Sequence, residues 1–232
     1  MKQTLSRNND LYETRFGYGE RNSMFRFLVF LLCILLLIGG FRIYWTSNFE
    51  AVKVVGSSMR TTLTSGDWLL LQKTQAKRGD VIVVDVRGYS EFRYDGGVLV
   101  PEKDRTTHLI KRLIAIEGDK VRCTDGVIEI CYANTQTWVT LDEPYAYYGT
   151  NNSYKNQYDF EEVYEVGEGE IFFLGDNRSA VGSSVDSRYN EGASRLDRLY
   201  KEEDIYGVVS QWAIDNCDWL KHFIVSPQEL WK

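Results

Sequence analysis

The chain has 232 residues, of which 44% are hydrophobic and 14% aromatic, so it can bury a sizeable core in one large domain or two small ones. Its net charge of −6 gives no electrostatic support to nucleic-acid binding. The four cysteines lack the spacing of metal ligands and there are only two histidines, which disfavours zinc catalysis.

The first 45 residues divide into a polar part and an apolar part. Residues 1–24 show no apolar periodicity, which predicts a disordered cytoplasmic tail. Residues 25–45 are apolar except for Arg26 and Arg42, and about 20 such residues can cross a membrane as a helix. Cations are more numerous before this segment than after it, so the positive-inside rule predicts a cytoplasmic N-terminus and an extracytoplasmic domain over 46–232.

We predict an uncleaved signal-anchor helix for this apolar segment. A cleaved signal peptide is one alternative, but no small-residue cleavage site follows the segment. A buried core helix is the other alternative, and it is disfavoured because the segment is apolar on every face.

Short alternating runs bounded by turns dominate the rest of the chain, and no helical period is evident between residues 50 and 210. The runs predict strands at 67–72, 80–85, 109–116, 121–132, 171–174 and 205–212. The predicted fold class is therefore mainly β, with a coiled antiparallel sheet preceded by one transmembrane helix.

Turn and loop signals refine this picture. A turn at Asp125-Gly126 would place Cys123 opposite Ile128, which gives no support to a disulfide between Cys123 and Cys131.

The polar stretches 86–107 and 142–167 predict excursions or a small inserted subdomain. The tail after residue 212 carries apolar side chains, and we expect it to pack on the domain rather than touch lipid.

Residues 55–63, with the sequence VGSSMRTTL, form a small-residue segment that suits neither a solvated loop nor a helix. Gly56 would let the backbone approach another group closely, as is needed where a serine hydroxyl and a backbone N–H must reach one carbonyl. Taken alone, the segment is more simply interpreted as an ordinary Gly-Ser-Ser turn.

A lysine interrupts the predicted strand at 109–116. Lys111 would share a strand face with Leu109 and Leu113, so it is buried, snorkelling or exposed on an edge strand. If it is buried, desolvation lowers the amine pKa from ~10.4 by up to about 3–5 pH units. A neutral amine could then accept a proton from a serine hydroxyl.

A third polar cluster follows the strand at 171–174. It comprises Gly175, Asp176, Asn177 and Arg178, and further on Ser184, Asp186, Ser187 and Arg188. Acids, arginines and hydroxyls in one loop predict a charge-assisted hydrogen-bond network, with a solvated loop as the alternative.

These three stretches, in this order behind an anchor, resemble type I signal peptidases of the bacterial Ser/Lys kind, the S26 family. That family's pattern begins Gly-x-Ser-Met-x-Pro-Thr-Leu, which Gly56, Ser58, Met59, Thr62 and Leu63 match. The resemblance covers roughly residues 25–212. It implies a coiled β-sheet catalytic domain with an insert near 120–167.

The resemblance also implies roles for individual residues. Ser58 would be the nucleophile, Lys111 the general base and Ser184 the hydroxyl that orients the lysine amine. The backbone N–H of Ser58 would form the oxyanion hole, and Gly56 stands where some relatives add a serine hydroxyl. Further roles are implied for six more residues: an ion pair of Arg112 with Asp176, bracing by Asp186 and Arg188, and lining of the substrate pocket by Met59 and Ile110.

The sequence departs from the family pattern at three places. Thr61 and Glu117 stand where the family usually has proline. The last motif carries about three extra residues around 180–183, so Ser184 is the expected lysine-orienting serine, with Ser183 and Ser179 as alternatives.

The function implied is that of a membrane-anchored serine endopeptidase that removes N-terminal signal peptides from exported preproteins. No metal or cofactor is implied, and the expected partners are signal peptides and the lipid bilayer, with no nucleic acid. The alternative is a catalytically impaired relative that acts in surface-protein or pilus assembly. A self-cleaving repressor-type protease and an anchored binding domain without chemistry are weaker alternatives. No oligomeric state is predicted.

Overall fold

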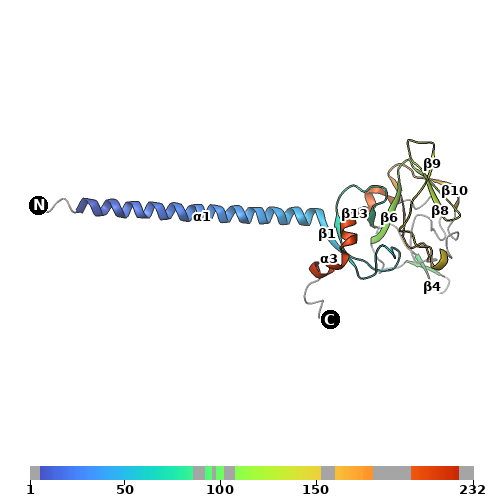
Figure 1. Ribbon diagram of the computed structural model, residues 1–232, viewed down its shortest axis with the longest axis horizontal. Coiled ribbons are helices and arrows are strands. Elements are labelled where there is room, and N and C mark those ends of the chain that lie inside the picture. Colours follow the sequence, from blue (N-terminus) through green and yellow to red (C-terminus); the bar gives the residue numbers. More distant parts are fainter. Residues whose placement is uncertain are drawn as a thin grey trace. The chain divides into compact units, whose positions relative to one another are not determined.

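The computed structural model describes residues 6–85, 92–95, 98–101, 108–152, 160–179 and 200–224. The chain forms two compact units, Met1–Asn48 and Phe49–Lys232 (Figure 1).

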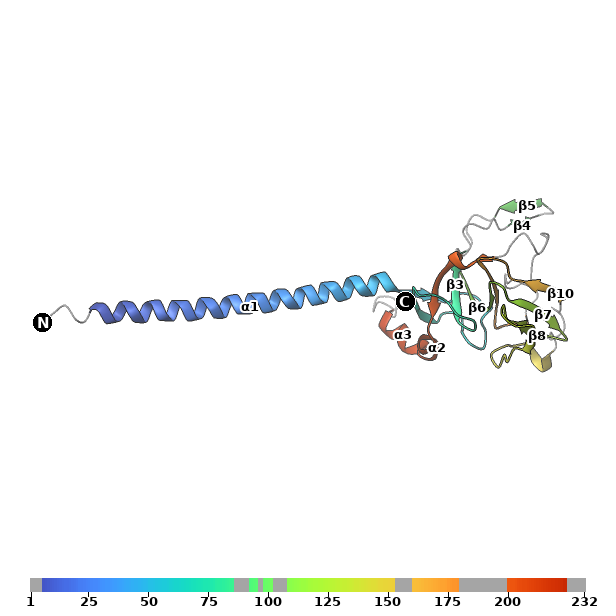
Figure 2. The same cartoon turned by 90° about the horizontal axis from the view of Figure 1, so that it is seen from above.

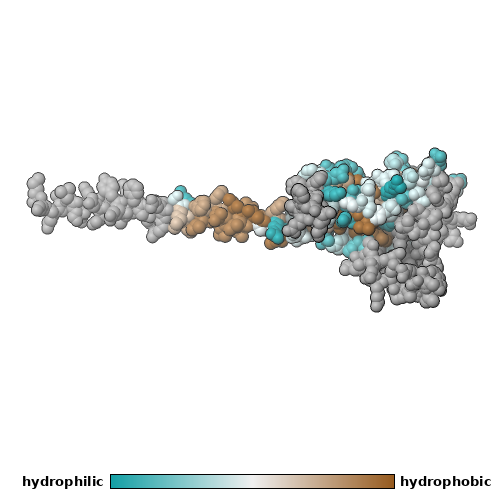
Figure 3. All heavy atoms as spheres, turned by 90° about the horizontal axis from the view of Figure 1, so that it is seen from below, coloured by the Kyte–Doolittle hydropathy of each residue, from teal (hydrophilic) through white to brown (hydrophobic). Residues whose placement is uncertain are grey.

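The first unit is one long helix, α1 (Ser6–Asn48). Its 26-residue part Ser23–Asn48 is long and apolar enough to cross a membrane, and the apolar side chains form one continuous band (Figure 3). At about 1.5 Å per residue this part exceeds the ~30 Å of a bilayer core. The helix continues back to Ser6, whereas the polar composition predicted a disordered tail there. Helical hydrogen bonds are local, so a helix nucleated in an apolar segment can extend into polar neighbours.

The second unit is built on a seven-stranded sheet with the order β1-β2-β13-β3-β6-β11-β12, in which every pairing is antiparallel. Its strands are β1 (Phe49–Lys53), β2 (Trp68–Gln72), β3 (Val81–Asp85), β6 (His108–Ile116), β11 (Glu170–Leu174), β12 (Tyr200–Lys201) and β13 (Ile205–Val209). The predicted mainly β, antiparallel fold is confirmed. The strand order is not the order of the sequence, and it places β6 in the interior of the sheet (Figure 2).

A four-stranded antiparallel sheet, with the order β10-β7-β8-β9, forms the predicted insert. Its strands are β7 (Lys120–Thr124), β8 (Val127–Cys131), β9 (Trp138–Thr140) and β10 (Phe160–Glu165). The β7–β8 turn at Asp125-Gly126 has positive φ at both residues, and Cys123 pairs with Ile128 as predicted. Within the polar stretch 86–107 the structure describes a hairpin of β4 (Phe92–Asp95) and β5 (Val98–Pro101).

Within the described residues, three clusters of buried side chains hold the second unit together. One cluster joins the two sheets, because side chains of β6 and β11 pack against side chains of β7 and β8. Another lies between β2, β3 and the loop after β1, and it includes Met59 and Leu63. The loop that follows β1 is thereby fixed to the sheet rather than left in solvent.

The predicted strand at 205–212 was too long. Strand β13 ends at Val209, and Trp212 lies in helix α2 (Gln211–Asp215), which is followed by α3 (Cys217–Ile224). The reason is local, because the Ser210 side chain accepts a hydrogen bond from the Ala213 N–H at 3.2 Å and caps the helix N-terminus. As expected, the described part of the tail packs on the domain, since Ala213 and Leu220 are buried in the cluster that contains Met59.

Candidate active site

The serine-bearing turn lies in the loop between β1 and β2. It is closed by backbone hydrogen bonds from Arg60 N–H to the Ser57 carbonyl (3.0 Å) and from Leu63 N–H to the Met59 carbonyl (2.8 Å). Gly56 has a φ of +95°, but a Cβ there would meet nothing within 4 Å. Glycine is thus suited to the backbone conformation of this turn, and the close approach to a substrate carbonyl stays a prediction. Ser58 is partly exposed.

The polar motif after β11 is joined to this turn through Asn177. Its backbone N–H donates to the Ser58 carbonyl and its side-chain amide donates to the Ser57 carbonyl, both at 2.9 Å. The neighbouring Asp176 carboxylate accepts a hydrogen bond from the Thr62 hydroxyl at 2.5 Å. The predicted polar network therefore includes the serine-bearing turn itself.

Lys111 is buried, with 1% of its surface exposed. It lies on β6 between β3 and β11 and pairs with Ile82 in the register of β3. The edge-strand and snorkelling interpretations of this lysine are thereby excluded. On the same strand, Leu109 and Leu113 pack in a cluster with Ile82, so the lysine shares its face with apolar side chains, as the alternation predicted.

The predicted ion pair of Arg112 with Asp176 is present and buried. The guanidinium donates from Nε to Oδ1 (2.9 Å) and from Nη2 to Oδ2 (2.7 Å), and its Nη1 donates to the Gly79 carbonyl at 2.7 Å. Asp176 is fully buried and Arg112 is 7% exposed. Because Arg112 adjoins Lys111 and Asp176 adjoins Asn177, this bidentate pair connects the lysine strand to the serine-bearing turn.

Residues 143–147, a segment that the sequence analysis did not single out, also contact this network. The Arg112 guanidinium lies over the Tyr145 ring, with Cζ 3.9 Å from the ring centroid. The Glu143 carboxylate accepts a hydrogen bond from Arg178 Nη2 at 2.6 Å. Tyr147 N–H donates to the Asp176 carbonyl at 2.8 Å. Burial, followed by the Glu143 carboxylate, raises the pKa of the Tyr145 hydroxyl, which therefore stays protonated.

The turn that follows strand β6 contains a second buried acid. Asp119 is fully buried and accepts from Arg78 Nε at 2.6 Å and from the Ala133 N–H at 3.0 Å. At Glu117, where the family usually has proline, the carboxylate accepts from the Gly169 N–H at 2.8 Å. A side-chain hydrogen bond thus holds the chain at this position.

Thr61, the other position where the family usually has proline, has a φ of +88°. Proline is restricted to a φ near −65°, so it cannot occupy this turn without rearranging it. The Thr61 hydroxyl donates to the Tyr145 carbonyl at 2.9 Å, which fastens the turn to the 143–147 segment. A positive φ at a β-branched residue is strained and persists only where the surroundings enforce it.

Thr61→Pro is expected to lower the free energy of unfolding by more than about 1 kcal/mol, because the ring excludes the observed φ. Thr61→Gly is the control, since glycine adopts positive φ freely and loses only the side-chain hydrogen bond. Chemical denaturation of both variants in detergent measures the difference. A proline variant as stable as wild type would show that the turn does not require this conformation.

Several predicted site residues lie outside the described residues, namely Ser183, Ser184, Asp186 and Arg188. The alternative Ser179 is described, and its N–H and hydroxyl both donate to Asn177 Oδ1. Met59 is 2% exposed, and Ile110 packs against the cluster that contains it.

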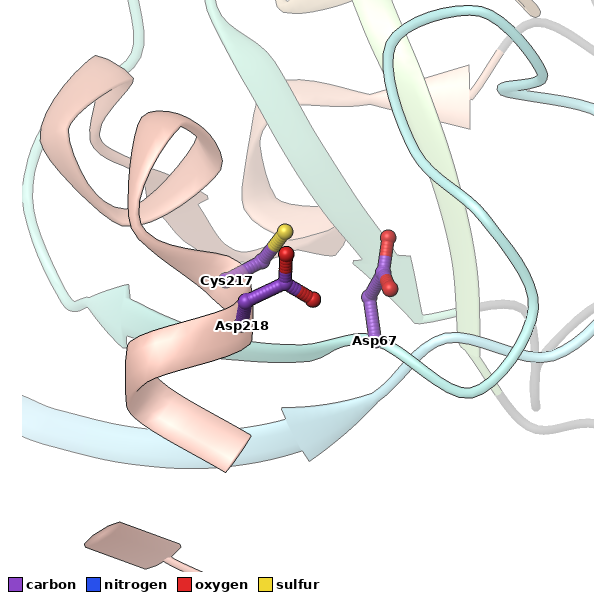
Figure 4. Close-up of side chains that lie close together, drawn as sticks. All are labelled: Asp67, Cys217 and Asp218. Carbon is purple, nitrogen blue, oxygen red and sulfur yellow. The ribbon is translucent and has the colours of Figure 1, made fainter. Parts of the chain in front are cut away.

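Another group of polar side chains lies where the start of α3 approaches the residue before β2 (Figure 4). The Cys217 sulfur and one carboxylate oxygen each of Asp67 and Asp218, which are atoms that can bind a metal, lie within 4.8 Å of one another. Burial, with the Asp67 and Asp218 carboxylates adding to it, raises the pKa of the Cys217 thiol. Because the thiolate is the form that binds metals, the raised pKa weakens this group as a metal ligand set. Asp67 also already accepts the Thr64 N–H at 2.7 Å.

Comparison with known proteins gives one consistent result. The family described as "Signal peptidase, peptidase S26" matches residues 24–212. A signal peptidase I of Bacillus licheniformis is 30% identical over 186 residues, which are 75% of this chain and 83% of that protein. A signal peptidase I of Rickettsia massiliae is 28% identical over 212 residues, covering 71% of each chain. A crystal structure of a signal peptidase I from Enterococcus faecalis is 24% identical, with a TM-score of 0.39, and covers 59% of this chain and 98% of that one.

Proposed function

The chain belongs to the signal peptidase, peptidase S26, family, and from this premise we propose that it removes N-terminal signal peptides from exported preproteins with a Ser58/Lys111 dyad. Signal peptidase I is a serine protease, so the reaction is hydrolysis of a peptide bond through an acyl-enzyme. The observation that carries the dyad assignment is the chain of contacts from Ser58 through Asn177, Asp176 and Arg112 to the neighbour Lys111.

In the proposed mechanism, Ser58 Oγ attacks the scissile carbonyl carbon while the neutral Lys111 amine takes the hydroxyl proton. The developing oxyanion accepts a hydrogen bond from the Ser58 backbone N–H. The lysine then gives its proton to the leaving amine as the C–N bond breaks. A water molecule, deprotonated by Lys111, attacks the ester, and the proton returns to Ser58 as the acid product leaves.

Burial of Lys111 supports its role as a base, because a desolvated site disfavours the charged form of an amine. Ser184 would hydrogen-bond the amine and fix its direction, and Asp186 with Arg188 would brace the loop. Met59 and Ile110, which belong to one cluster, would line the pocket for a small side chain before the cut. The substrate would bind in extended form, as an added strand.

Membrane anchoring by residues 25–45 and an extracytoplasmic domain over 46–232 complete the proposal. The apolar part of α1 is long enough for a span, and the four cations Lys2, Arg7, Arg15 and Arg21 precede it, with Arg26 at its start. Positive charge of this kind favours retention of the N-terminus in the cytoplasm. The domain would then lie at the extracytoplasmic surface of the membrane that holds the anchor, where exported preproteins emerge.

The test is cleavage of a preprotein whose signal ends in Ala-x-Ala by the full chain in detergent, with the new N-terminus identified by mass spectrometry. Wild type is expected to cut after the small residue, and Ser58→Ala to be inactive although folded. The matched control is Ser57→Ala, because Ser57 is the adjacent hydroxyl on the same turn and should be dispensable. Equal cleavage by wild type and Ser58→Ala would overturn the nucleophile assignment. A folded but inactive wild type would favour the assembly role instead.

A further inference from the structure

An exposed arginine lies two residues after the proposed nucleophile. The Arg60 N–H donates to the Ser57 carbonyl at 3.0 Å, so the backbone of Arg60 belongs to the turn that carries Ser58. The family pattern specifies the residues at Ser58 and Met59 but leaves the next position open. The side chain at position 60 can therefore differ between relatives without altering the shared chemistry.

The positive charge of Arg60 is held in place by an aromatic ring. Its guanidinium lies over Tyr147, with Cζ 5.8 Å from the ring centroid. A cation within about 6 Å of a ring centroid is attracted by the negative face of the ring. Tyr147 is itself fixed, because its N–H donates to the Asp176 carbonyl at 2.8 Å and its carbonyl accepts from the Arg178 N–H at 2.7 Å. The guanidinium is thus favoured at one place beside the nucleophile.

Among the residues that the structure describes, no carboxylate lies within ion-pair distance of the Arg60 guanidinium. The acids of the neighbouring network already have partners, since Asp176 pairs with Arg112 and Glu143 pairs with Arg178. The second unit as a whole contains more acidic than basic residues. Arg60 is therefore a local positive charge in an acidic domain, and its guanidinium can bind a carboxylate that comes from outside the domain.

The neighbouring residue indicates which part of a substrate would meet this charge. Met59 is 2% exposed and is proposed above to line the pocket for the small side chain before the cut, whereas Arg60 is exposed to solvent. A peptide whose residue before the cut lies at Met59 must continue past Ser58 and out of the pocket. The pocket-filling residues of an Ala-x-Ala end are small and uncharged. A carboxylate near the scissile bond is therefore expected in the segment after the cut.

We propose that Arg60 is a specificity-determining residue that binds an acidic side chain within the first few residues after the cut. It would favour exported preproteins whose mature part begins with aspartate or glutamate. The inference rests on the proposed signal-peptide cleavage and deepens it by naming a class of substrate. Salt screens an exposed guanidinium–carboxylate contact, so the preference should be greatest at low ionic strength. The contact exists in the bound substrate as well as in the transition state, so it should act mainly on KM.

The first test compares three peptides that share one Ala-x-Ala end. One has aspartate at the first two positions after the cut, one has asparagine there, and one has asparagine there but aspartate at x. For the full chain in uncharged detergent, kcat/KM is expected to be about fivefold higher for the first peptide than for the second at low salt. This ratio should approach one in about 0.5 M salt.

Variants of Arg60 test whether this side chain sets the ratio. Arg60→Gln should bring the ratio close to one, Arg60→Glu should invert it, and Arg60→Lys should keep most of it, because lysine retains the charge. Each ratio is taken within one variant, so any loss of folded protein cancels. The matched control is Lys73→Glu, since Lys73 is also an exposed cation over a tyrosine ring, that of Tyr206 at 5.6 Å.

The control should keep the wild-type ratio. A ratio that is the same in wild type and Arg60→Glu would contradict the proposal. An effect of Arg60 confined to the peptide with aspartate before the cut would also contradict it, because the charge would then act on the wrong side of the scissile bond.

A binding measurement separates this inference from the proposed hydrolysis. The affinities of the labelled aspartate and asparagine peptides for the full-length Ser58→Ala variant are measured by fluorescence anisotropy, which needs no cleavage. The aspartate peptide is expected to bind about fivefold more tightly, and Ser58→Ala/Arg60→Glu should invert the order. Equal affinities would overturn the inference even if wild type cleaves both peptides. A preference in binding without any cleavage by wild type would support the inference and count against the hydrolysis.

Discussion

Replacement of Lys111 by methionine is expected to lower kcat/KM for preprotein cleavage by about 10²–10⁴-fold, the usual contribution of a general base. Methionine has a similar length and no charge, and Lys111 is 1% exposed, so the substitution should leave the interior of the sheet intact. Denaturation midpoints should therefore stay near the wild-type value while activity is lost.

The double variant Ser58→Ala/Lys111→Met sharpens this prediction. If the two side chains act as one unit, the double variant should be no less active than either single variant, because the second replacement removes nothing further. Lys120→Met is the matched control, since Lys120 is an exposed lysine that pairs with Glu165 on the inserted sheet. A methionine variant of Lys111 that cleaves as wild type does would remove this lysine from the mechanism.

Replacement of Asp176 by asparagine is expected to lower the free energy of unfolding by about 3–5 kcal/mol, because it leaves the buried Arg112 charge without its counterion. The same carboxylate also accepts the Thr62 hydroxyl, so the serine-bearing turn loses a contact. Native proteins typically have a free energy of unfolding of about 5–15 kcal/mol, so a loss of this size brings the variant close to unfolding.

The matched control for this second prediction is Glu129→Gln. Glu129 also pairs with an arginine, Arg122, but both side chains of that pair are substantially exposed, at 26% and 39%. Exposed ion pairs contribute about 0–1 kcal/mol, so this variant should unfold close to wild type. Denaturation of both variants in detergent, monitored by near-UV circular dichroism, gives the free energy of unfolding of each and so distinguishes the buried pair from the exposed one. Similar losses at the two sites would mean that burial does not govern the energy of the Arg112–Asp176 pair.

Local sequence signals predicted much of the fold. The apolar segment at 25–45 lies within the helix found, and alternation located most strands of the main sheet to within a few residues. The Asp125-Gly126 turn gave the register of β7 and β8, and with it Cys123 opposite Ile128. These features depend on hydrogen bonds and side-chain periodicities that span few residues.

The sequence by itself also determined which residues are candidates for the chemistry, since Ser58, Lys111 and the Asp176-containing motif stand out by residue type and order along the chain alone. Only the tertiary structure decided that Lys111 is buried, because strands distant in sequence, β3, β11 and β13, supply the buried cluster on the sheet face that Lys111 shares with Leu113. It likewise decided that Tyr145 stacks on Arg112 and that Thr61 takes a positive φ. The physical reason is that burial and backbone strain are set by contacts between segments far apart in the chain, which no local pattern encodes.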